Sequence, residues 1–471
     1  MAAMPFWFAQ ALARDPAVAP ALAGETRADV CIVGGGFTGL WTALQLKAQD
    51  PCLDVVLIEA ERCGAGASGR NGGCVLTWAT KFFTLLRLFG EAEAVRLVRE
   101  SEAAVLAIER FVVDHGIECE FRLDGTLYTA TNATQQGSLD AVVGALEQRG
   151  ISTYSHWPLQ QVRQRSGSER HLEGVYSPIA ASVQPALLVR GLRRVALERG
   201  VRLFEGTPLA RLDATGQPVV HTPGGQVRAR KVVLATNAWM PRMFADFARH
   251  VVLVSSDMAI TEPCPELLAA CGLVDGLAVL DSRIFVHYYR RTPDGRLMLG
   301  KGGNTFAFAN RVQRSFDAPS AYRGQLERAL HDFFPALRSV PIAATWNGAS
   351  DRSATGLPFF GHWRGHRDVV YGFGYSGNGV GPSHLGARLL VSLVREVDDD
   401  WSRSPLARGP LGAFPPEPLR WLGAITVRNA VRRKERAEDL GRRPAWFDVQ
   451  LARLAAAAGK SDKQPAAPAQ H

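Results

Sequence analysis

A glycine-rich turn between a short apolar strand and a helix constrains this chain more than any other feature. Residues 30–33 form the apolar strand, and Gly34, Gly36 and Gly39 follow it at G-x-G-x-x-G spacing. The first glycine permits a tight turn, the second lets the backbone approach a pyrophosphate, and the third lets the next helix pack close to the strand. Free N–H groups at the start of that helix, expected over 40–47, attract phosphate oxygens. The pattern predicts a dinucleotide-binding strand–helix–strand unit.

The acidic residue that completes this unit narrows the choice of dinucleotide. A second apolar strand over 54–58 ends at Glu59, twenty residues after Gly39. A carboxylate at this point can accept hydrogen bonds from both hydroxyls of an adenosine ribose, which favours an unphosphorylated ribose. The residues alone therefore favour FAD or NAD over NADP, with Phe37 and Thr38 of the turn beside the cofactor.

Length, composition and cysteine spacing exclude several classes of protein. The chain has 471 residues, which predicts two interleaved domains with appendages. It has no run of about 18 apolar residues, so we expect no membrane-spanning helix, and its start lacks the pattern of a secretory signal. The seven cysteines show no C-x-x-C spacing, which indicates reduced thiols and neither a disulfide frame nor a zinc site. We therefore expect a cytoplasmic protein with no metal and no membrane partner.

The net charge of +9 arises partly from the segment 428–443, where acidic residues interrupt a basic run. We interpret this segment as a solvated helix with local ion pairs. No nucleic-acid partner is expected, because no aromatic platform or known binding motif accompanies it. The other interpretation is a basic funnel that attracts an anionic substrate.

The order of apolar runs and turns predicts an α/β fold of the α+β type. A Rossmann-like nucleotide-binding domain alternates along the chain with an inserted antiparallel-sheet substrate domain, in which Asp294-Gly295 marks a hairpin turn. We expect an N-terminal arm over 1–24, the nucleotide-binding domain over 25–80, 151–240 and 346–400, the substrate domain over 81–150 and 241–345, a C-terminal extension over 401–459 and a disordered tail over 460–471.

Two further glycine-rich segments are expected to approach the cofactor. The segment 64–73 follows the Glu59 strand, and its Ser68 and Arg70 suit a phosphate; the alternative is an exposed flexible loop. The segment 372–381 lies between a strand and a helix, whose N–H groups would stabilise negative charge; the alternative is a turn with only a packing role.

Together these segments resemble the FAD-dependent amine oxidoreductases of the D-amino-acid oxidase, sarcosine oxidase and glycine oxidase superfamily. The matching segments are 33–39, Glu59, 66–73, 232–238, 346–348 with 355–358, and 374–380, in the family's order. The resemblance covers 28–395 and implies a D-amino-acid oxidase-like fold and FAD. Some sarcosine oxidase relatives attach FAD to a cysteine, and Cys63 and Cys74 flank the flavin loop, but we expect non-covalent FAD. The cofactor-binding residues that we expect are Gly34, Gly36, Phe37, Thr38, Gly39, Glu59, Ala67, Ser68, Arg70, Asn71, Gly72, Gly73, Leu209, Thr236, Asn237, Gly348, Gly377, Asn378, Gly379 and Val380.

A closer resemblance, to bacterial aminophosphonate oxidoreductases, extends over nearly the whole chain. It rests on the segments 63–74, 77–83, 286–290, 299–305, 401–406 and 431–436. It implies oxidation of 2-aminoethylphosphonate or its N-alkyl derivatives to phosphonoacetaldehyde and an amine. Hydride transfer to flavin N5 and imine hydrolysis would be followed by flavin reoxidation, with oxygen as the expected acceptor and hydrogen peroxide as its product.

A phosphonate dianion needs a cationic pocket, since its desolvation is otherwise costly. By position we expect Lys81, Arg290 and Trp78 to bind substrate, and Lys301, His287 and Tyr288 to be catalytic. Lys301 could alternatively bind the phosphonate, or promote oxygen reduction near the flavin. Surface roles for the cations and a structural role for His287 are the alternatives. Strand alternation places Tyr288 and Arg290 on one face and His287 and Tyr289 on the other. It leaves open which face lines the site.

Three other functions stay open at this point. The first is oxidation of another amine by the same superfamily: a secondary amine of the sarcosine type, a conjugate such as γ-glutamylputrescine, or a D-amino acid. The second is a flavoprotein without redox chemistry or a nucleic-acid-binding protein, which only the basic segment supports. The third is an NAD-dependent dehydrogenase, against which the turn 372–381 argues. The sequence does not determine the oligomeric state.

Overall fold

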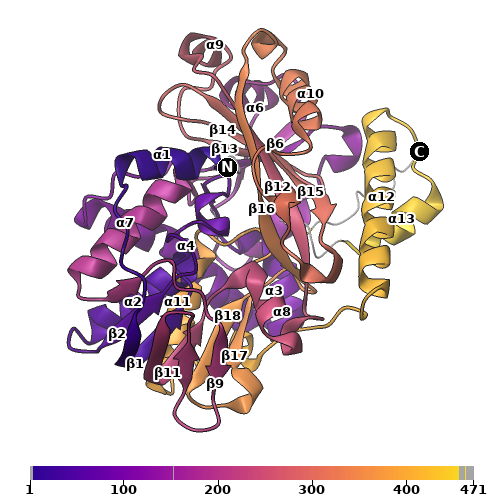
Figure 1. Cartoon of the computed structure of the whole chain (residues 1–471). Coiled ribbons are helices and arrows are strands. Elements are labelled where there is room, and N and C mark those ends of the chain that lie inside the picture. Colours follow the sequence, from indigo (N-terminus) through magenta and orange to yellow (C-terminus); the bar gives the residue numbers. More distant parts are fainter. Residues whose placement is uncertain (1–3, 152, 456–461, 463–471) are drawn as a thin grey trace.

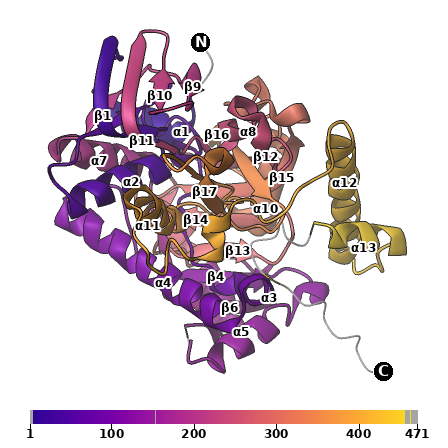
Figure 2. The same cartoon turned by 90° about the horizontal axis from the view of Figure 1, so that it is seen from below.

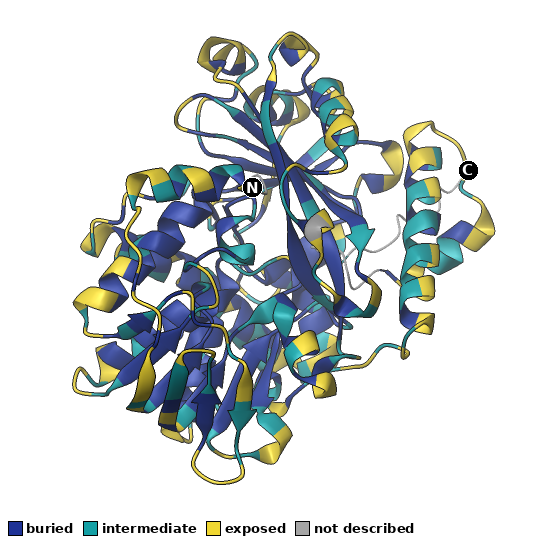
Figure 3. Cartoon of the chain, viewed as in Figure 1, coloured by how far each residue is buried: buried dark blue, intermediate teal, exposed yellow. Residues whose placement is uncertain are grey.

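The computed structural model describes residues 4–151, 153–455 and Asp462. Two eight-stranded sheets lie beside each other, the first with its helices in the lower part of Figure 1 and the second in the upper part. Buried residues fill both sheets and the helices packed on the first, whereas the C-terminal helices at the right carry many exposed positions (Figure 3). The mixed α/β fold predicted from the sequence is confirmed.

The first sheet has the order β17-β18-β11-β1-β2-β8, parallel from β18 to β8, with β17 antiparallel at the edge. Strand β10 pairs with β11, and β9 pairs with β10. Its central strand β1 pairs in parallel with β11 on one side and β2 on the other, and Cys31 lies opposite both Val232 and Val56. Val55–Ile58 is buried throughout, as expected for a strand covered on both faces. The strands are β1 Gly24–Val33, β2 Val55–Ile58, β8 Arg202–Phe204, β9 Arg211–Asp213, β10 Val219–His221, β11 Gly225–Leu234, β17 Phe359–His362 and β18 Val369–Phe373.

The connection after β1 determines where a ligand can bind. Helix α2 (Phe37–Gln49) leads the chain from β1 to β2, whereas β11 approaches β1 from the other side. Such a switch in direction opens a crevice at the carboxyl ends of the strands. Helix α2 packs against α7 (Pro185–Glu198) and α11 (Pro382–Arg395), which explains why nearly all of its residues are buried. The N-terminal helix α1 (Phe6–Arg14) packs on α7, and α4 (Glu91–Asp114) on α11.

The second sheet has the order β16-β12-β15-β14-β13-β4-β6-β5 and is antiparallel except at β13 and β4. The predicted hairpin at Asp294-Gly295 joins β14 and β15. Its strands are β4 Thr126–Ala130, β5 Ser155–His156, β6 Glu173–Ser177, β12 Val251–Thr261, β13 Ala278–Asp281, β14 His287–Arg291, β15 Leu297–Phe306 and β16 Ile342–Ser353. A short pair, β3 (Cys74–Val75) with β7 (Ala181–Ser182), stands apart, and the remaining helices here are α3 Phe82–Phe89, α5 Asp140–Glu147, α6 Leu159–Ser166, α8 Met240–Met243, α9 Pro265–Ala270 and α10 Arg323–Phe333.

Strands β5, β6 and β16 belong to the second sheet, although their residues lie in segments predicted for the nucleotide-binding domain. That prediction covers 151–240 and 346–400, but β6 pairs with β4 from Thr126↔Ser177 to Ala130↔Glu173. The chain therefore leaves the second sheet only after Ser177. Strand β16 pairs with β12 over its whole length, as far as Ser353.

The C-terminal extension forms a helical hairpin of α12 (Leu419–Asp439) and α13 (Trp446–Arg453). It lies at the edge of the molecule, with α12 beside β15 (Figures 1 and 2). The disordered tail predicted over 460–471 lies outside the described residues except for Asp462. Among the described residues, no helix combines the length and the apolar character that crossing a bilayer requires.

Candidate functional site

A cavity of about 410 Å³ opens at the carboxyl ends of β1 and β2 and extends to the second sheet. Seventeen of the twenty residues predicted to hold the cofactor line it: Gly34, Gly36, Phe37, Thr38, Glu59, Ala67, Ser68, Arg70, Asn71, Gly72, Leu209, Thr236, Asn237, Gly348, Gly377, Gly379 and Val380. Gly39, Gly73 and Asn378 lie behind this lining. Among the predicted substrate-binding and catalytic residues, Tyr288 lines the cavity.

The first glycine turn packs tightly enough that two of its glycines are required for steric reasons. Gly34 has a positive φ of 115°, and a Cβ there would lie 2.6 Å from the carbonyl oxygen of Ala235. A Cβ on Gly39 would lie 2.0 Å from the carbonyl oxygen of Gly34. Gly36 precedes α2 and provides no capping side chain. The start of α2 therefore faces the cavity with backbone only, which suits the close approach of phosphates.

Glu59 lies where a ribose is expected. Its Oε2 accepts a hydrogen bond from the N–H of Gly35 at 2.7 Å, and its Oε1 accepts one from Glu61 at 3.0 Å. Burial raises the pKa of this carboxyl. These two bonds hold the carboxylate in the cavity wall and leave acceptor capacity on both oxygens.

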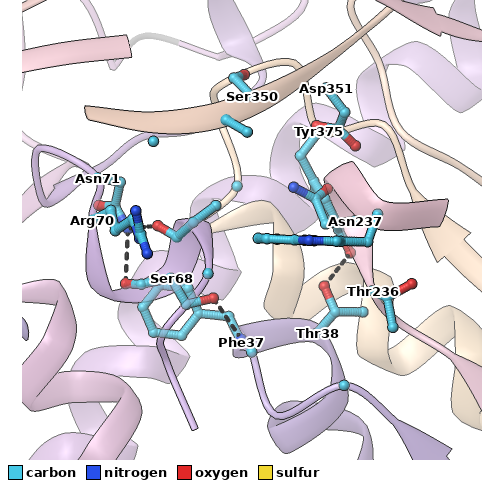
Figure 4. A pocket seen from close by; sticks show the side chains of 18 of the residues that line it. Phe37, Thr38, Ser68, Arg70, Asn71, Thr236, Asn237, Ser350, Asp351 and Tyr375 are labelled. Atoms are coloured by element: carbon cyan, nitrogen blue, oxygen red, sulfur yellow. Dashed lines mark hydrogen bonds between the residues drawn. The ribbon is translucent and has the colours of Figure 1, made fainter. Parts of the chain in front are cut away.

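The loop 64–73 forms one side of the cavity, and Asn237, Asp351 and Tyr375 lie on the other (Figure 4). Ser68 Oγ accepts a hydrogen bond from the N–H of Phe37 at 2.9 Å and so fastens this loop to the start of α2. Arg70 donates to Ala65 O at 2.7 Å and pairs with Asp317 at 2.8 Å. Its guanidinium thus holds the loop against the second domain, besides lining the cavity.

The opposite side contains a buried carboxylate that the sequence analysis did not single out. Asp351 Oδ2 accepts the N–H of Gly374 at 2.5 Å and, with the amide of Asn237 turned so that its nitrogen faces the carboxylate, a second bond at 2.6 Å. Burial raises the pKa of Asp351 to about 7. Tyr375 accepts a hydrogen bond from Thr38 Oγ1 at 3.0 Å, which ties the turn 372–381 to α2.

The part of the cavity next to the second sheet carries polar groups suited to a small substrate. The hydroxyl of Tyr288 lies 3.0 Å from Ser256 Oγ of β12. Arg352, at the end of β16, lines the same wall and donates to the carbonyl oxygen of Ser376. Ser350 Oγ, two residues earlier, is buried without a hydrogen-bond partner among the described residues. Such a hydroxyl is available to a ligand.

The predicted cations occupy different places. Lys81 is 5% exposed and lies behind the cavity lining, with its Nζ 3.7 Å from the carboxylate of Asp462. Burial lowers its pKa, and the nearby guanidinium of Arg352 lowers it further. Arg290 is fully buried; it donates to Gly72 O at 2.9 Å and to Val183 O at 2.8 Å. Trp78 is also buried outside the lining.

Lys301 and His287 turn away from the cavity. Lys301 Nζ donates to the carbonyl oxygen of Phe285 at 2.9 Å, and His287 Nδ1 lies 2.9 Å from Asp281 Oδ2. Burial lowers the pKa of His287 to about 4. Tyr288 and Arg290 do share a face, as alternation predicts, and it is the face toward the loop 64–73. The roles assigned to these residues stay predictions.

The residues missed by sequence reasoning are mainly Asp351, Arg352 and Ser256. Asp351 and Arg352 lie between two segments on which the family resemblance rests, 346–348 and 355–358. Their position between these two segments is the sequence feature that could have identified them. Ser256 lies inside the strand Val251–Thr261, where the polar run Ser255-Ser256-Asp257 does not by itself indicate a binding role.

Comparisons with known proteins agree with this geometry. Residues 29–393 match the family model "DAO: FAD dependent oxidoreductase". The chain is 31% identical over 401 residues to OrdL of Rhizobium meliloti (strain 1021), described as a probable oxidoreductase, covering 82% of this chain and 87% of that protein. It is 30% identical over 370 residues to the gamma-glutamylputrescine oxidoreductase of Escherichia coli (strain K12), covering 78% and 83%. The crystal structure of glycine oxidase from Geobacillus kaustophilus superposes with a TM-score of 0.66 at 22% identity, covering 81% of this chain and 98% of that one, and shows the same fold.

Proposed function

We propose that this chain, which belongs to the family of FAD-dependent oxidoreductases, oxidises the C–N bond of 2-aminoethylphosphonate or of its N-alkyl derivatives. The family accounts for the coarser activity, FAD-dependent oxidation of an amine or amino acid. The finer proposal is supported by the segments similar to aminophosphonate oxidoreductases and by one observation: a guanidinium, that of Arg352, lines the part of the cavity next to the second sheet.

The residues present fit FAD. Gly34 and Gly36 clear space for a pyrophosphate at the start of α2, and Glu59 offers oxygens to a ribose. Asn237, Gly377 and Val380 would lie beside the rest of the cofactor. We propose that FAD is held without a covalent bond. Cys63 is buried against Gly35, and burial raises the pKa of its thiol well above the ordinary value. Cys74 does line the cavity, so the mass of the denatured protein with and without FAD tests this proposal at Cys74. When bound, FAD supplies the two-electron acceptor for oxidation of the C–N bond.

Four side chains would bind and orient the substrate. Arg352 would hold the phosphonate, and Lys81, whose Nζ lies 3.7 Å from the carboxylate of Asp462, would add a weaker attraction at longer range. The hydroxyls of Tyr288 and Ser256 lie on the same wall and would orient the amine end. We do not assign the phosphonate to Arg290, because it does not line the cavity and its Nε and Nη2 already donate to the carbonyl oxygens of Gly72 and Val183.

The products, the electron acceptor and the cellular location are also part of the proposed function. Loss of a hydride from the carbon beside the neutral amine leaves an iminium ion, and addition of water with release of a proton cleaves it to phosphonoacetaldehyde and an amine. We propose oxygen as the final electron acceptor and the cytoplasm as the location. The seven cysteines, all free thiols in the structure, agree with a reducing compartment.

Replacing Arg352 tests whether its guanidinium binds the phosphonate. Arg352→Gln keeps a donor for the Ser376 carbonyl but removes the charge. The KM for 2-aminoethylphosphonate should rise about tenfold to a hundredfold, while propylamine, which lacks the acid, is oxidised as before. The matched control is Arg364→Gln, at an exposed arginine paired with Asp246. Equal losses for both amines at normal FAD content would overturn the assignment.

A polyamine conjugate such as γ-glutamylputrescine is the second candidate substrate. The observation that favours it is the 30% identity to a protein described as gamma-glutamylputrescine oxidoreductase. A glutamyl carboxylate would also suit Arg352. The two candidates therefore differ in which amine reduces the cofactor. Comparing the amines directly distinguishes them better than a mutation does.

A further inference from the structure

We propose that the C-terminal helix α12 positions the substrate wall of the cavity, and that Glu435 is the positioning residue through which it acts. Helix α12 lies beyond the residues 29–393 that the family model covers. It stands at the side of the second sheet in Figures 1 and 2, away from the first sheet. The proposal concerns the oxidation itself and does not depend on which amine is the substrate.

Helix α12 contacts three consecutive residues of the segment that leads into β14. Arg283 donates to Asp439 from both terminal nitrogens, at 2.9 and 2.7 Å. The N–H of Ile284 donates to Glu435 Oε1 at 2.9 Å. The ring of Phe285 belongs to the same apolar cluster as Val431 and Ala452. Backbone, charge and apolar contacts thus hold this segment from one side.

The residues that follow form part of the cavity wall. Val286 and Tyr288 both line the cavity, and Tyr288 contacts Ser256 there. Only Phe285 separates Ile284, which Glu435 holds, from Val286. A shift of the segment would therefore move the surface against which a substrate lies, and small misplacements of reacting groups have large effects on rate.

Buried charges make the position of Glu435 important. Lys301 of β15 donates to the carbonyl oxygen of Phe285 at 2.9 Å, and Glu435 is only 9% exposed. The negative charge of Glu435 favours the charged form of Lys301, whose pKa burial lowers. On the same side, Asp281 bonds both Arg283 and His287. Removal of one partner from such a network leaves an uncompensated buried charge.

The alternative is that these contacts only attach α12 to the body of the protein. A variant on the same helix distinguishes the two. Glu438 is as buried as Glu435, at 8%, but it pairs with Lys434 of its own helix at 2.5 Å. Glu435→Gln and Glu438→Gln therefore remove the same charge from the same helix, and only the first touches the segment before β14.

The experiment measures anaerobic flavin reduction by a saturating amine, the visible flavin spectrum, and Tm, for each FAD-loaded variant. Glu435→Gln should slow reduction about tenfold and alter the shape of the flavin band, with a Tm within a few degrees of that of Glu438→Gln.

A second variant keeps the test decisive if Glu435→Gln does not fold. Asp439→Asn removes the charge and one of the two acceptors that Arg283 uses, at an exposed position, and it should produce a smaller effect of the same kind. Unchanged reduction rates and flavin spectra in these variants, with losses of Tm alone, would overturn the proposal. If no amine reduces the wild-type flavin, the proposed function fails, while the spectra still test the role of Glu435.

Discussion

At the scale of single residues, the pKa of Asp351 is raised by its surroundings. Its carboxylate lies in the cavity wall, and burial raises its pKa from an ordinary value of 3.8 to about 7. A raised pKa in the folded state means that folding favours the protonated carboxyl. The contribution of Asp351 to the free energy of unfolding is therefore fully present below pH 3.8, and it is lost as pH rises toward 7.

Replacement of Asp351 by asparagine tests this sign. The asparagine side chain mimics the protonated carboxyl and does not ionise. The Tm of Asp351→Asn relative to wild type should therefore rise between about pH 4 and pH 7 and level off above that. Thermal unfolding of the FAD-loaded proteins in matched buffers measures it. A difference in Tm that stays constant across this range would contradict the raised pKa.

The same scale shows what sequence reasoning can assign. Glycines and Glu59 were found because a backbone motif has a fixed spacing, and the structure brings them to one cavity. Arg290 and Lys301 were chosen by position alone. Their side chains end on the backbone carbonyls of Val183 and Phe285, and no local pattern indicates such distant partners. Arg352, which does line the cavity, has no motif of its own.

At the scale of elements, the close packing of α2 on β1 makes a direct prediction. A methyl group at Gly39 would meet the carbonyl oxygen of Gly34 at 2.0 Å, so Gly39→Ala must displace the helix. We expect a loss of roughly 1–3 kcal/mol in the free energy of unfolding, together with weaker FAD retention. Gly423→Ala in α12 is the control, since nothing lies within 4 Å of its Cβ position.

Chemical unfolding and the FAD content of the purified variants measure both effects. Gly423→Ala should leave stability unchanged or raise it slightly, because alanine favours a helix interior by about 1 kcal/mol over glycine. Equal stability and FAD content in the two variants would show that α2 does not need to approach β1 so closely.

Strand assignment illustrates why elements are easier to predict than their partners. Alternation predicts which residues of β14 share a face, and it leaves open which face lines the site. The pairing of β6 with β4 was not predicted, because the two strands are separated by the helices α5 and α6, and short strands carry no signal of their partner. Register and sheet membership are decided by long-range packing, which the local pattern does not contain.

At the scale of the whole molecule, the cavity lies between the two sheets, and we propose that the first binds the cofactor and the second supplies the substrate wall. The cavity between them takes Gly34 from one and Tyr288 from the other. In this proposal, the identity of the amine depends on a few side chains of the cavity wall, such as Arg352 and Ser350. The extension around α12 adds a support for that wall that the family model does not cover.

Anaerobic mixing of the FAD-loaded protein with a panel of amines tests the central claim most directly. The panel is 2-aminoethylphosphonate, its N-methyl derivative, sarcosine and γ-glutamylputrescine, and the visible flavin absorbance reports reduction. We predict rapid bleaching by a phosphonate amine, with phosphonoacetaldehyde as the product, and slow or no bleaching by the others. Rapid bleaching by γ-glutamylputrescine or sarcosine alone would contradict the proposed substrate and leave the fold and the cofactor as they are.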